Sequence, residues 1–449
     1  MSSGESTVSR GQHVPLPRNR NYQLLWVSQV LSGIGVSASV IAFPLLVLAL
    51  TGSAAASGVV LGTVAAAQLI VGLPAGAVAD RWDRKKIMLS CEVIQVFAAA
   101  SLVAALWWGV AHIAHLVVVA AVLGGCAALF RPAEDASLPW VVPAEQLSTA
   151  VALNAARGSV AQLSGTAAGG FLFALARFVP FAVDVLAHLL ACTLLAFLRI
   201  PPREGGPEPT RHLGREILTG LQWVWGQRYI RVTALCAVVL NLFFAAFYLI
   251  VIVLAQARGV PSGQIGVMAA MLGVGGLLGA LVASRLSSEL SPYVSIIAVL
   301  WVLAAVTPVA AFLSNGYLLG ALFAVIALLP PTANTTIITQ QLLLTPDHLR
   351  GRLSSVLAIL TGGAAALGPM LGGLLAMWLS DTYAVLVCAS GIAVIAVMAT
   401  LSPTLRHFPR PQTAVKLPET EPTLDTELTS ARGVNRQGVD RQNVSRKGD

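Results

Sequence analysis

The fold is decided by a short charged stretch between two long apolar segments, Gly76-Ala-Val-Ala-Asp80-Arg81-Trp-Asp83-Arg84-Lys85-Lys86. The apolar segments on either side contain about twenty residues each, which is the length that a helix needs to cross a bilayer. Lipid offers no hydrogen-bond partner for the backbone, so a segment that crosses it must be helical. The same alternation of apolar segment and short polar loop recurs along the chain. The sequence therefore predicts an all-α integral membrane protein.

Composition excludes a protein that binds nucleic acid through a basic surface. Only 11% of the 449 residues are charged, whereas a soluble domain has about 25%, and the mean hydropathy is +0.78. The net charge of +8 lies in short loops between apolar segments rather than on one soluble face. The cysteines are scattered without any CxxC spacing, so they predict neither a metal site nor a disulfide framework. They are Cys91, Cys126, Cys192, Cys236 and Cys388.

The apolar segments predict twelve membrane-spanning helices in two bundles of six. Bounds read from hydropathy alone are good to about four residues. The expected spans are Leu24–Leu50, Ser57–Ala79, Ile87–Val110, Ile113–Phe130, Val151–Phe173, Pro180–Leu198, Ile230–Leu254, Ile265–Leu286, Val294–Leu313, Tyr317–Gln341, Leu353–Leu379 and Ala384–Leu401.

Polar segments divide the chain into five parts. In the central linker, Glu216–Trp225 has apolar residues at helical spacing and is expected on the membrane surface. The tail is polar and is expected to be disordered. The five parts are a cytoplasmic segment over 1–23, a six-helix bundle over 24–198, a cytoplasmic linker over 199–229, a second six-helix bundle over 230–402 and a cytoplasmic tail over 403–449.

The two bundles repeat each other in sequence. Gly76 in the second span corresponds to Gly279 in the eighth. The pattern Gly165–Gly169–Gly170 in the fifth span corresponds, at the same offset, to Gly368–Gly372–Gly373 in the eleventh. Two related halves around a site at the membrane midplane are the usual architecture of secondary transporters.

The basic residues predict the orientation. With the N-terminus inside, all Lys and Arg residues except Arg157, Arg177 and Arg258 fall on the cytoplasmic side or at its edge. This asymmetry follows the positive-inside rule. We therefore expect a multi-pass protein of the plasma (inner) membrane with both termini in the cytoplasm.

The charged stretch resembles the signature loop of the major facilitator superfamily, Gly-x-x-x-Asp-Arg-x-Gly-Arg-Lys, with Asp83 in place of the second Gly. The resemblance covers all twelve spans. Three further stretches resemble the branch that contains macrolide-efflux proteins and the enterobactin exporter: Asn19-Arg-Asn-Tyr-Gln-Leu-Leu-Trp26, Leu50-Thr-Gly-Ser53 and Pro346-Asp-His-Leu-Arg-Gly-Arg352. The resemblance implies a bacterial exporter of small amphipathic molecules, such as drugs, macrolides or siderophore-like metabolites, that works by alternating access and is coupled to protons.

The signature loop is expected to act as a gate. Gly76 would let neighbouring helices approach closely. In this family, Asp80 is expected to contact the start of the eleventh span, and Arg81, Arg84 and Lys85 are expected to pair with acids or lipid headgroups. The alternative is that the basic residues only anchor the loop on the cytoplasmic side.

Ionisable residues inside spans are expensive and are therefore functional candidates. Asp184 and His188 are four residues apart on one face of the sixth span and are candidates for a proton relay. Asp184 is also close enough to the start of its span to act as a cap. Arg157 in the fifth span is a candidate for coupling or for a structural ion pair. Glu92 is a candidate as well, with a pair to a loop arginine as the alternative. Exporters of this branch often carry an acidic residue in the first span, and Ser32-Gly-Ile-Gly-Val-Ser37 has none.

Isolated polar and aromatic residues in the spans are candidates for a substrate cavity. Mostly apolar walls with a few polar groups suit amphipathic ligands. The alternative is that the aromatic residues pack in the core and that the threonines bond to their own helices. The candidates are Gln68, Asn154, Asn241, Phe244, Tyr248, Asn334 and Thr335.

Other functions remain as alternatives. An importer or uniporter of a small polar nutrient, or a non-transporting receptor, would fit the same fold. An integral-membrane enzyme is disfavoured because the chain has no Asp-rich diphosphate site, GxSxG or HExxH pattern, and it has no Walker loop for ATP. We therefore expect no catalytic residues, metal or cofactor. The expected partners are a small-molecule substrate, protons and the lipid bilayer, and the protein is expected to function as a monomer.

Overall fold

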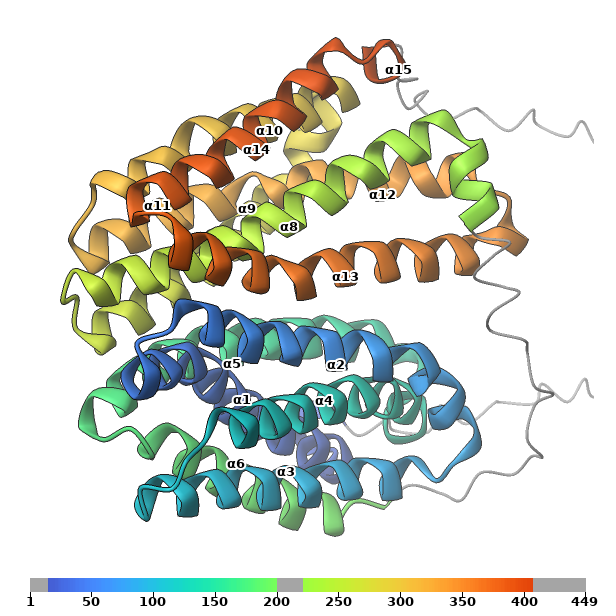
Figure 1. The fold of residues 1–449 in the computed structure, drawn as a ribbon. Coiled ribbons are helices and arrows are strands. Elements are labelled where there is room, and N and C mark those ends of the chain that lie inside the picture. Colours follow the sequence, from blue (N-terminus) through green and yellow to red (C-terminus); the bar gives the residue numbers. More distant parts are fainter. Residues whose placement is uncertain (1–14, 200–220, 407–449) are drawn as a thin grey trace, which may run out of the picture. The chain divides into compact units, whose positions relative to one another are not determined.

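The computed structural model describes residues 15–199 and 221–406, and within these ranges the chain is helical and contains no strand. Figure 1 shows the helices running side by side. The N-terminal half consists of η1 (Leu16–Arg18), α1 (Arg20–Thr51), α2 (Ala54–Arg81), α3 (Arg84–Trp107), α4 (Ile113–Val141), η2 (Ala144–Gln146), α5 (Leu147–Leu175) and α6 (Val179–Ala196).

The C-terminal half begins after the linker and repeats this arrangement with two interruptions. One span ends in a 3₁₀ turn, and another is divided in two. The elements are α8 (Arg228–Ala257), α9 (Ser262–Glu289), α10 (Pro292–Val306), η3 (Thr307–Phe312), α11 (Gly316–Leu328), α12 (Pro330–Leu344), α13 (Asp347–Trp378), α14 (Asp381–Leu401) and α15 (Pro403–Arg406).

Short polar residues set the helix ends. Gly52 ends α1 in the left-handed region, with φ of 66°, which costs glycine little because it has no Cβ. Ser53 then caps α2 by accepting a hydrogen bond from the backbone N–H of Ala56 at 3.2 Å. Asp83 caps α3 in the same way, through the N–H of Lys86 at 3.1 Å.

One helix bound differs markedly from the sequence prediction, and the break expected at Pro330 and Pro331 is observed. The fourth span was expected to end at Phe130, but α4 continues to Val141 in spite of Pro132 and Pro139. Glu134 therefore lies in a helix rather than in a loop. The tenth span is divided at Leu329 into α11 and α12, because Pro330 and Pro331 have no N–H to continue the hydrogen-bond ladder.

The expected surface helix over Glu216–Trp225 falls only partly within the described residues. Residues 221–226 are helical, and Val224 is buried against Ile230 of α8 and Leu353 of α13. This part therefore packs on the bundle through Val224, while Trp225 is exposed. Residues 1–14, 200–220 and 407–449 lie outside the described residues. The first four residues of the tail that was expected to be disordered are described, and they form the short helix α15.

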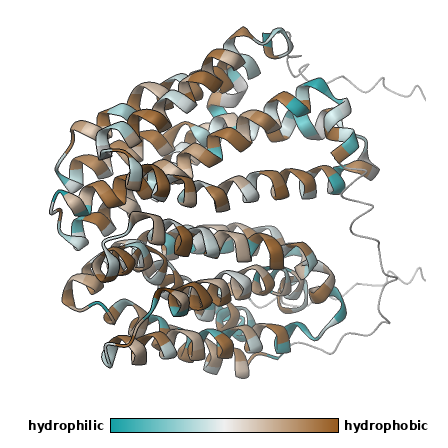
Figure 2. Ribbon diagram, viewed as in Figure 1, coloured by the Kyte–Doolittle hydropathy of each residue, from teal (hydrophilic) through white to brown (hydrophobic). Residues whose placement is uncertain are grey.

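The helices are suited to a membrane. Eleven segments of the described chain are long and apolar enough to cross a bilayer, and Figure 2 shows apolar residues along most of their length. The twelfth expected span, α5, has 29 residues but is less apolar than the others. Exposed aromatic residues lie near both ends of the helices, as at the two interfaces of a membrane. They include Trp82, Trp140 and Trp225 at one end and Trp107, Trp108 and Trp378 at the other.

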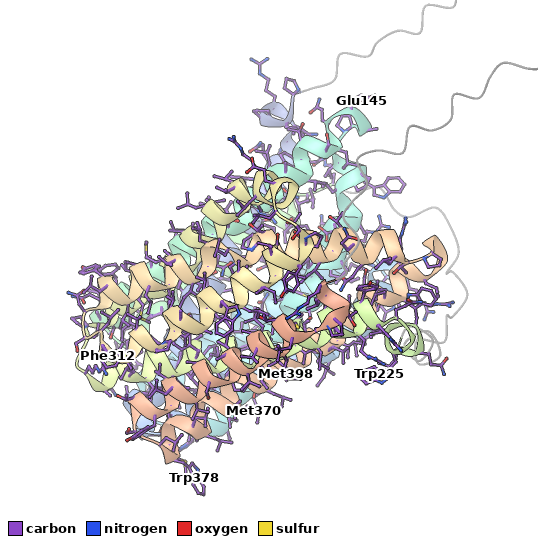
Figure 3. All side chains as sticks on the ribbon, turned by 90° about the horizontal axis from the view of Figure 1, so that it is seen from above. Glu145, Trp225, Phe312, Met370, Trp378 and Met398 are labelled. Carbon is purple, nitrogen blue, oxygen red and sulfur yellow. The ribbon has the colours of Figure 1, made fainter. Side chains whose placement is uncertain are left out.

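The first of these ends also carries Arg81–Lys86, and we call it the basic end. The other is called the opposite end. Figure 3 shows Trp225 toward the basic end, and Phe312 and Trp378 toward the opposite end.

The two bundles are joined by glycines that occupy equivalent places in the repeat. In α5, Gly165 and Gly169 pack on the backbone of α1, which belongs to the same bundle, at Ile34 and Ala38. The third glycine, Gly170, packs instead on the backbone of α9 in the other bundle. A Cβ at any of these glycines would lie under 3.0 Å from a backbone oxygen.

The second bundle makes the same contacts. In α13, Gly368 and Gly372 pack on the backbone of α8, at Leu242 and Ala246. Gly373 packs across the interface on Ala54 of α2. The duplication that the sequence predicts is therefore matched by equivalent packing. In each triplet, two glycines hold the helix to its own bundle and the third holds the bundles together.

This packing between the bundles is confined to the half of the helices near the opposite end. Toward the basic end, a Cβ added at Gly76, Gly158 or Gly276 would have no atom from outside its own helical backbone within 4 Å. Seven of the ten residues over 151–160 of α5 are exposed. The expectation that Gly76 lets two helices approach closely is thus wrong for this conformation, in which the bundles are separated at the basic end.

We predict that Gly170→Ala destabilises the protein by about 1–3 kcal/mol, because the added methyl group overpacks the contact between α5 and α9. The matched control is Gly158→Ala on the same helix, which has free space and should be neutral or stabilising by about 0.5–1 kcal/mol. The measurement is the apparent Tm of each purified variant in detergent. Equal Tm values for the two variants would show that the glycine contact does not hold the bundles together.

Candidate functional site

A cluster of charged and polar side chains is fully buried within the N-terminal bundle. Glu92 comes from α3, and Asp184 and His188 come from consecutive turns of α6. All three residues have a relative exposure of 0%. Ser32 and Ser39 of α1 complete the cluster; they are two turns apart and therefore share one face of their helix.

The two carboxylates contact opposite nitrogens of the imidazole ring. His188 Nδ1 lies 2.6 Å from Glu92 Oε2, and His188 Nε2 lies 3.3 Å from Asp184 Oδ1, an ion-pair contact that is too poorly aligned to count as a hydrogen bond. Ser39 Oγ donates a hydrogen bond to Asp184 Oδ2 at 2.8 Å, and Ser32 Oγ is 3.3 Å from His188 Nδ1. The carboxylates do not converge on one point, so this is not the geometry of a metal site.

The cluster contains two carboxyl groups and one imidazole. An imidazolium can donate from both nitrogens and neutralise one of the two carboxylates. No lysine or arginine contacts the group among the described residues, and Glu92 Oε1 is buried without a hydrogen-bond partner. A buried carboxylate without a cationic partner is costly. Binding one further proton would remove that cost, so the cluster has the chemistry of a site that gains and loses a single proton.

The structure corrects one expectation for Glu92. The alternative considered for this residue was an interfacial pair with a loop arginine, but it is fully buried and pairs with His188. The expected capping role of Asp184 is not observed either. Its carboxylate faces Ser39 and His188 rather than the N-terminus of its own helix.

A second buried ion pair lies nearer the basic end. Arg157 Nη1 of α5 is 2.7 Å from Glu134 Oε1 of α4, and both side chains are nearly inaccessible. Nearby, the hydroxyl of Tyr22 donates to Asn154 Oδ1 at 3.5 Å. Arg157 thus forms an ion pair with an acidic residue, as expected if its role is structural. Asn154 contacts α1 through Tyr22. Sequence reasoning missed Glu134 because the fourth span was expected to end at Phe130, which leaves Glu134 outside it.

The signature loop makes its observed contacts within the N-terminal bundle. Arg84 donates to the backbone oxygen of Ala136 in α4 at 2.7 Å, and Lys85 donates to that of Ala196 at 2.8 Å. Ala196 is the last residue of α6, where the helix dipole favours a cation. Asp80 and Arg81 are exposed, and no interaction is observed for them among the described residues. The replacement of Gly by Asp83 has a local explanation, because Asp83 caps α3.

An apolar pocket of about 500 Å³ lies in the C-terminal bundle. It forms where α8, α10 and α12 meet beside the proline break, and its volume is within the usual range for small-molecule sites. Three of the cavity candidates line it: Asn241 and Phe244 from α8, and Asn334 from α12. Asn241 also donates to the backbone oxygen of Ala237 at 2.8 Å. The amides supply polar groups in a wall that is otherwise almost wholly apolar.

The remaining candidates lie elsewhere. Tyr248 stacks on Phe323 with ring centroids 5.9 Å apart, so it packs in the core. Thr335 is exposed and donates to the backbone oxygen of Pro331 in its own helix at 2.9 Å. Gln68 is exposed on α2 and does not line this pocket.

We predict that His188→Ala destabilises the protein by about 3–5 kcal/mol, because it leaves two buried carboxylates without their partner. The matched control is His115→Ala; this histidine is near the opposite end and contacts only exposed Ser101. Thermal unfolding of the purified variants measures the difference. A His188→Ala protein as stable as the control would contradict the ion-pair geometry.

The chain is similar to known transporters over almost its whole length. A family model described as transmembrane secretion effector matches residues 11–438. The multidrug efflux pump Tap of Mycolicibacterium fortuitum is 27% identical over 409 residues, which cover 86% of this chain and 96% of that protein. Macrolide efflux protein A of Streptococcus pyogenes is 27% identical over 133 residues, 29% of this chain and 33% of that protein.

Solved structures share the fold. A bacterial homologue of the human lysosomal transporter Spinster, in an inward-facing and unoccupied conformation, aligns with a TM-score of 0.67 and 15% identity over 88% of this chain and 98% of its own. A variant of the nucleoside transporter NupG aligns with a TM-score of 0.69 and 13% identity over 86% of this chain and 100% of its own. These matches confirm the predicted fold, and the family match confirms a transporter rather than an enzyme. The chain belongs to the transmembrane secretion effector family, within the major facilitator superfamily.

Proposed function

We propose that this transporter exports small amphipathic molecules by alternating access and that proton binding drives the export. The observation that carries the proposal is the buried Glu92–His188–Asp184 cluster, which has two carboxyl groups for one imidazole. The names of the efflux pump Tap and of macrolide efflux protein A support export and the substrate class. The apolar pocket with two amides in the C-terminal bundle has the composition that an amphipathic ligand needs.

The position of the cluster supports a coupling role. On one face of α1, Ser39 bonds to Asp184, and a Cβ at Gly35 would clash with Asp184. The neighbouring face of the same segment packs on Gly165 and Gly169 of α5.

The next glycine on α5, Gly170, contacts α9 of the other bundle. A change in the charge of the cluster would therefore act on α1 first and reach the bundle interface through one intervening helix. The thiols of Cys91, Cys126 and Cys192 are the other titratable groups close to this cluster.

The orientation is part of the proposal. The basic end would face the cytoplasm, as the positive-inside rule requires, so both termini would be cytoplasmic and the separated bundle ends would open inward. A substrate would enter from the cytoplasm or from the inner leaflet. A proton taken up from outside would be released inside. In the outward-open state, Asp80 would close the basic end against the start of α13, as the family resemblance implies.

We predict that Glu92→Gln and Asp184→Asn each abolish the stimulation of transport by a pH gradient, because each removes a site for the exchanged proton. The measurement is uptake of a fluorescent amphipathic dye into everted vesicles, with and without an acidic interior. Both variants should retain dye exchange in the absence of a gradient. The matched control is Asp135→Asn, an exposed carboxylate near the basic end that should behave as wild type. Proton coupling through the cluster is excluded if the gradient still stimulates uptake in both variants.

We predict that Phe244→Ala weakens dye binding about 10-fold or more, since burial of an aromatic side chain contributes about 1.5–3 kcal/mol. Asn334→Ala should also weaken binding. Its matched control is Thr335→Ala, the adjacent residue, which does not line the pocket. Fluorescence titration of the purified variants with the same dye measures the affinities. If Thr335→Ala has the larger effect, the substrate does not bind in this pocket.

A further inference from the structure

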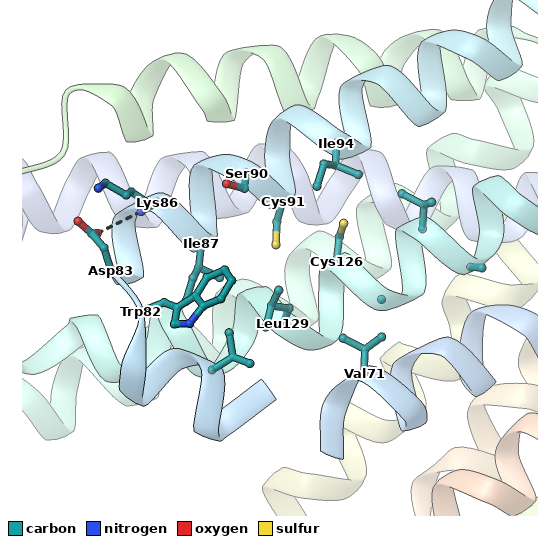
Figure 4. Close-up of a pocket in the computed structure, with 14 residues that line it drawn as sticks. Val71, Trp82, Asp83, Lys86, Ile87, Ser90, Cys91, Ile94, Cys126 and Leu129 are labelled. Atoms are coloured by element: carbon teal, nitrogen blue, oxygen red, sulfur yellow. Dashed lines mark hydrogen bonds between the residues drawn. The ribbon is translucent and has the colours of Figure 1, made fainter. Parts of the chain in front are cut away.

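A groove opens on the N-terminal bundle, and two of its lining residues, Cys91 and Cys126, lie beside the buried charged cluster. Figure 4 shows its walls, which are formed by α2 and α3, with α4 as the floor. Its volume is about 780 Å³, larger than that of the pocket in the C-terminal bundle. The polar residues that line it are Asp83, Lys86 and Ser90, together with the thiols of Cys91 and Cys126.

The groove exists because α2 and α3 do not pack on each other along their length. α2 packs mainly on α4 and α13, whereas α3 packs mainly on α4 and α6. Between them α4 presents small side chains, Ala121, Gly125 and Cys126, which recur at helical spacing on one face. A larger residue on this face would fill the space, so the hollow is a property of the sequence of α4.

The groove faces lipid. Its lining belongs to membrane-spanning helices, and Ile94, in its wall, is half exposed with no protein covering it. Trp82 lies at the mouth near the basic end and is 68% exposed. An exposed indole near the end of a membrane-spanning helix is typical of the headgroup region of a bilayer.

The mouth of the groove has a basic side chain, Lys86, whose ammonium group does not bond to the described residues. Arg84 and Lys85 both donate to backbone oxygens of neighbouring helices. Lys86 is exposed, and its ammonium group has no hydrogen bond or ion pair with the described residues. The carboxylate of Asp83 is close by, but it accepts the backbone N–H of Lys86 as the cap of α3. The N-terminus of α3, which favours anions, points to the same place.

We propose that this groove binds one anionic phospholipid from the leaflet at the basic end. An acyl chain lies in the apolar part along Val71, Ile94 and Leu129, and the phosphate group pairs with Lys86. Charge decides between this occupant and a cationic amphiphile. Asp83 offsets part of the charge of Lys86, but the stretch over 80–86 has four basic and two acidic residues, and its net positive charge attracts the first and repels the second. The site is separate from the proposed substrate pocket and does not depend on proton coupling.

The first test is native mass spectrometry of the full-length protein with equal amounts of phosphatidylglycerol and phosphatidylcholine. The wild-type protein should retain one molecule of phosphatidylglycerol in preference to phosphatidylcholine. Lys86→Gln should lower this preference about five-fold, the effect of one basic residue at a membrane surface. Ala121→Phe should reduce the retention of both lipids by filling the groove.

The matched control is Arg20→Gln. Arg20 is an exposed basic residue at the start of α1, also at the basic end, and it does not line the groove. It should leave the preference unchanged. An equal effect of Arg20→Gln and Lys86→Gln would overturn the proposal, because it would mean that the whole basic surface attracts the lipid.

The second test uses the native cysteines and needs no substitution. Phosphatidylglycerol should slow the alkylation of Cys91 and Cys126 by N-ethylmaleimide, since both line the groove. Cys236 lines the pocket in the C-terminal bundle and is the internal control. Peptide mass spectrometry gives the rate at each thiol. Equal protection of all three thiols, or protection by tetraphenylphosphonium but not by phosphatidylglycerol, would refute an anionic lipid site.

Discussion

Close contact between glycine and backbone at two equivalent places holds this transporter together. Each bundle would gain little from apolar contact with the other, because lipid tails are as apolar as the helix surfaces they would replace. The contact must instead come from close packing, which requires that no Cβ lie between the backbones. Gly170 and Gly373 meet this requirement for the two crossings, from α5 to α9 and from α13 to α2. Gly58 and Gly62 of α2 and Gly266 of α9 make further close contacts with backbone across the same two crossings. No such contact is seen at Gly76 and Gly158 toward the basic end.

The buried charges are placed where this interface can respond to them. A charge inside a membrane protein is expensive unless it is paired, and the cluster around His188 is paired only in part. Its contact with α1 is made by two serines and by Gly35, where Asp184 approaches so closely that no side chain would fit. The same segment of α1 packs on the glycines of α5. Helix α1 therefore contacts both the charged cluster and α5, the helix that carries Gly170 of the bundle interface.

The basic end combines several separate uses of charge. Arg84 and Lys85 fix the start of α3 to α4 and α6 by binding backbone oxygens. Asp83 caps α3, while Asp80 and Arg81 are exposed. A single charged stretch thus contains residues with a local structural role and residues that are free to act between the bundles. The spacing of the motif alone does not separate the two groups.

Hydropathy and glycine spacing predicted the membrane fold and the duplication, because both are local properties of the chain that can be recognised without tertiary contacts. The sequence also identified Asp184 and His188 as neighbours, since residues four apart share a helix face. The packing of the helices was needed to show that Glu92 joins them and that Glu134 pairs with Arg157. It was also needed to show which of the cavity candidates share a pocket, namely Asn241, Phe244 and Asn334. These pairings join different helices, and the rotation of each helix about its axis is set by packing against several neighbours at once. A sequence pattern gives the faces of one helix but not the helix that each face meets.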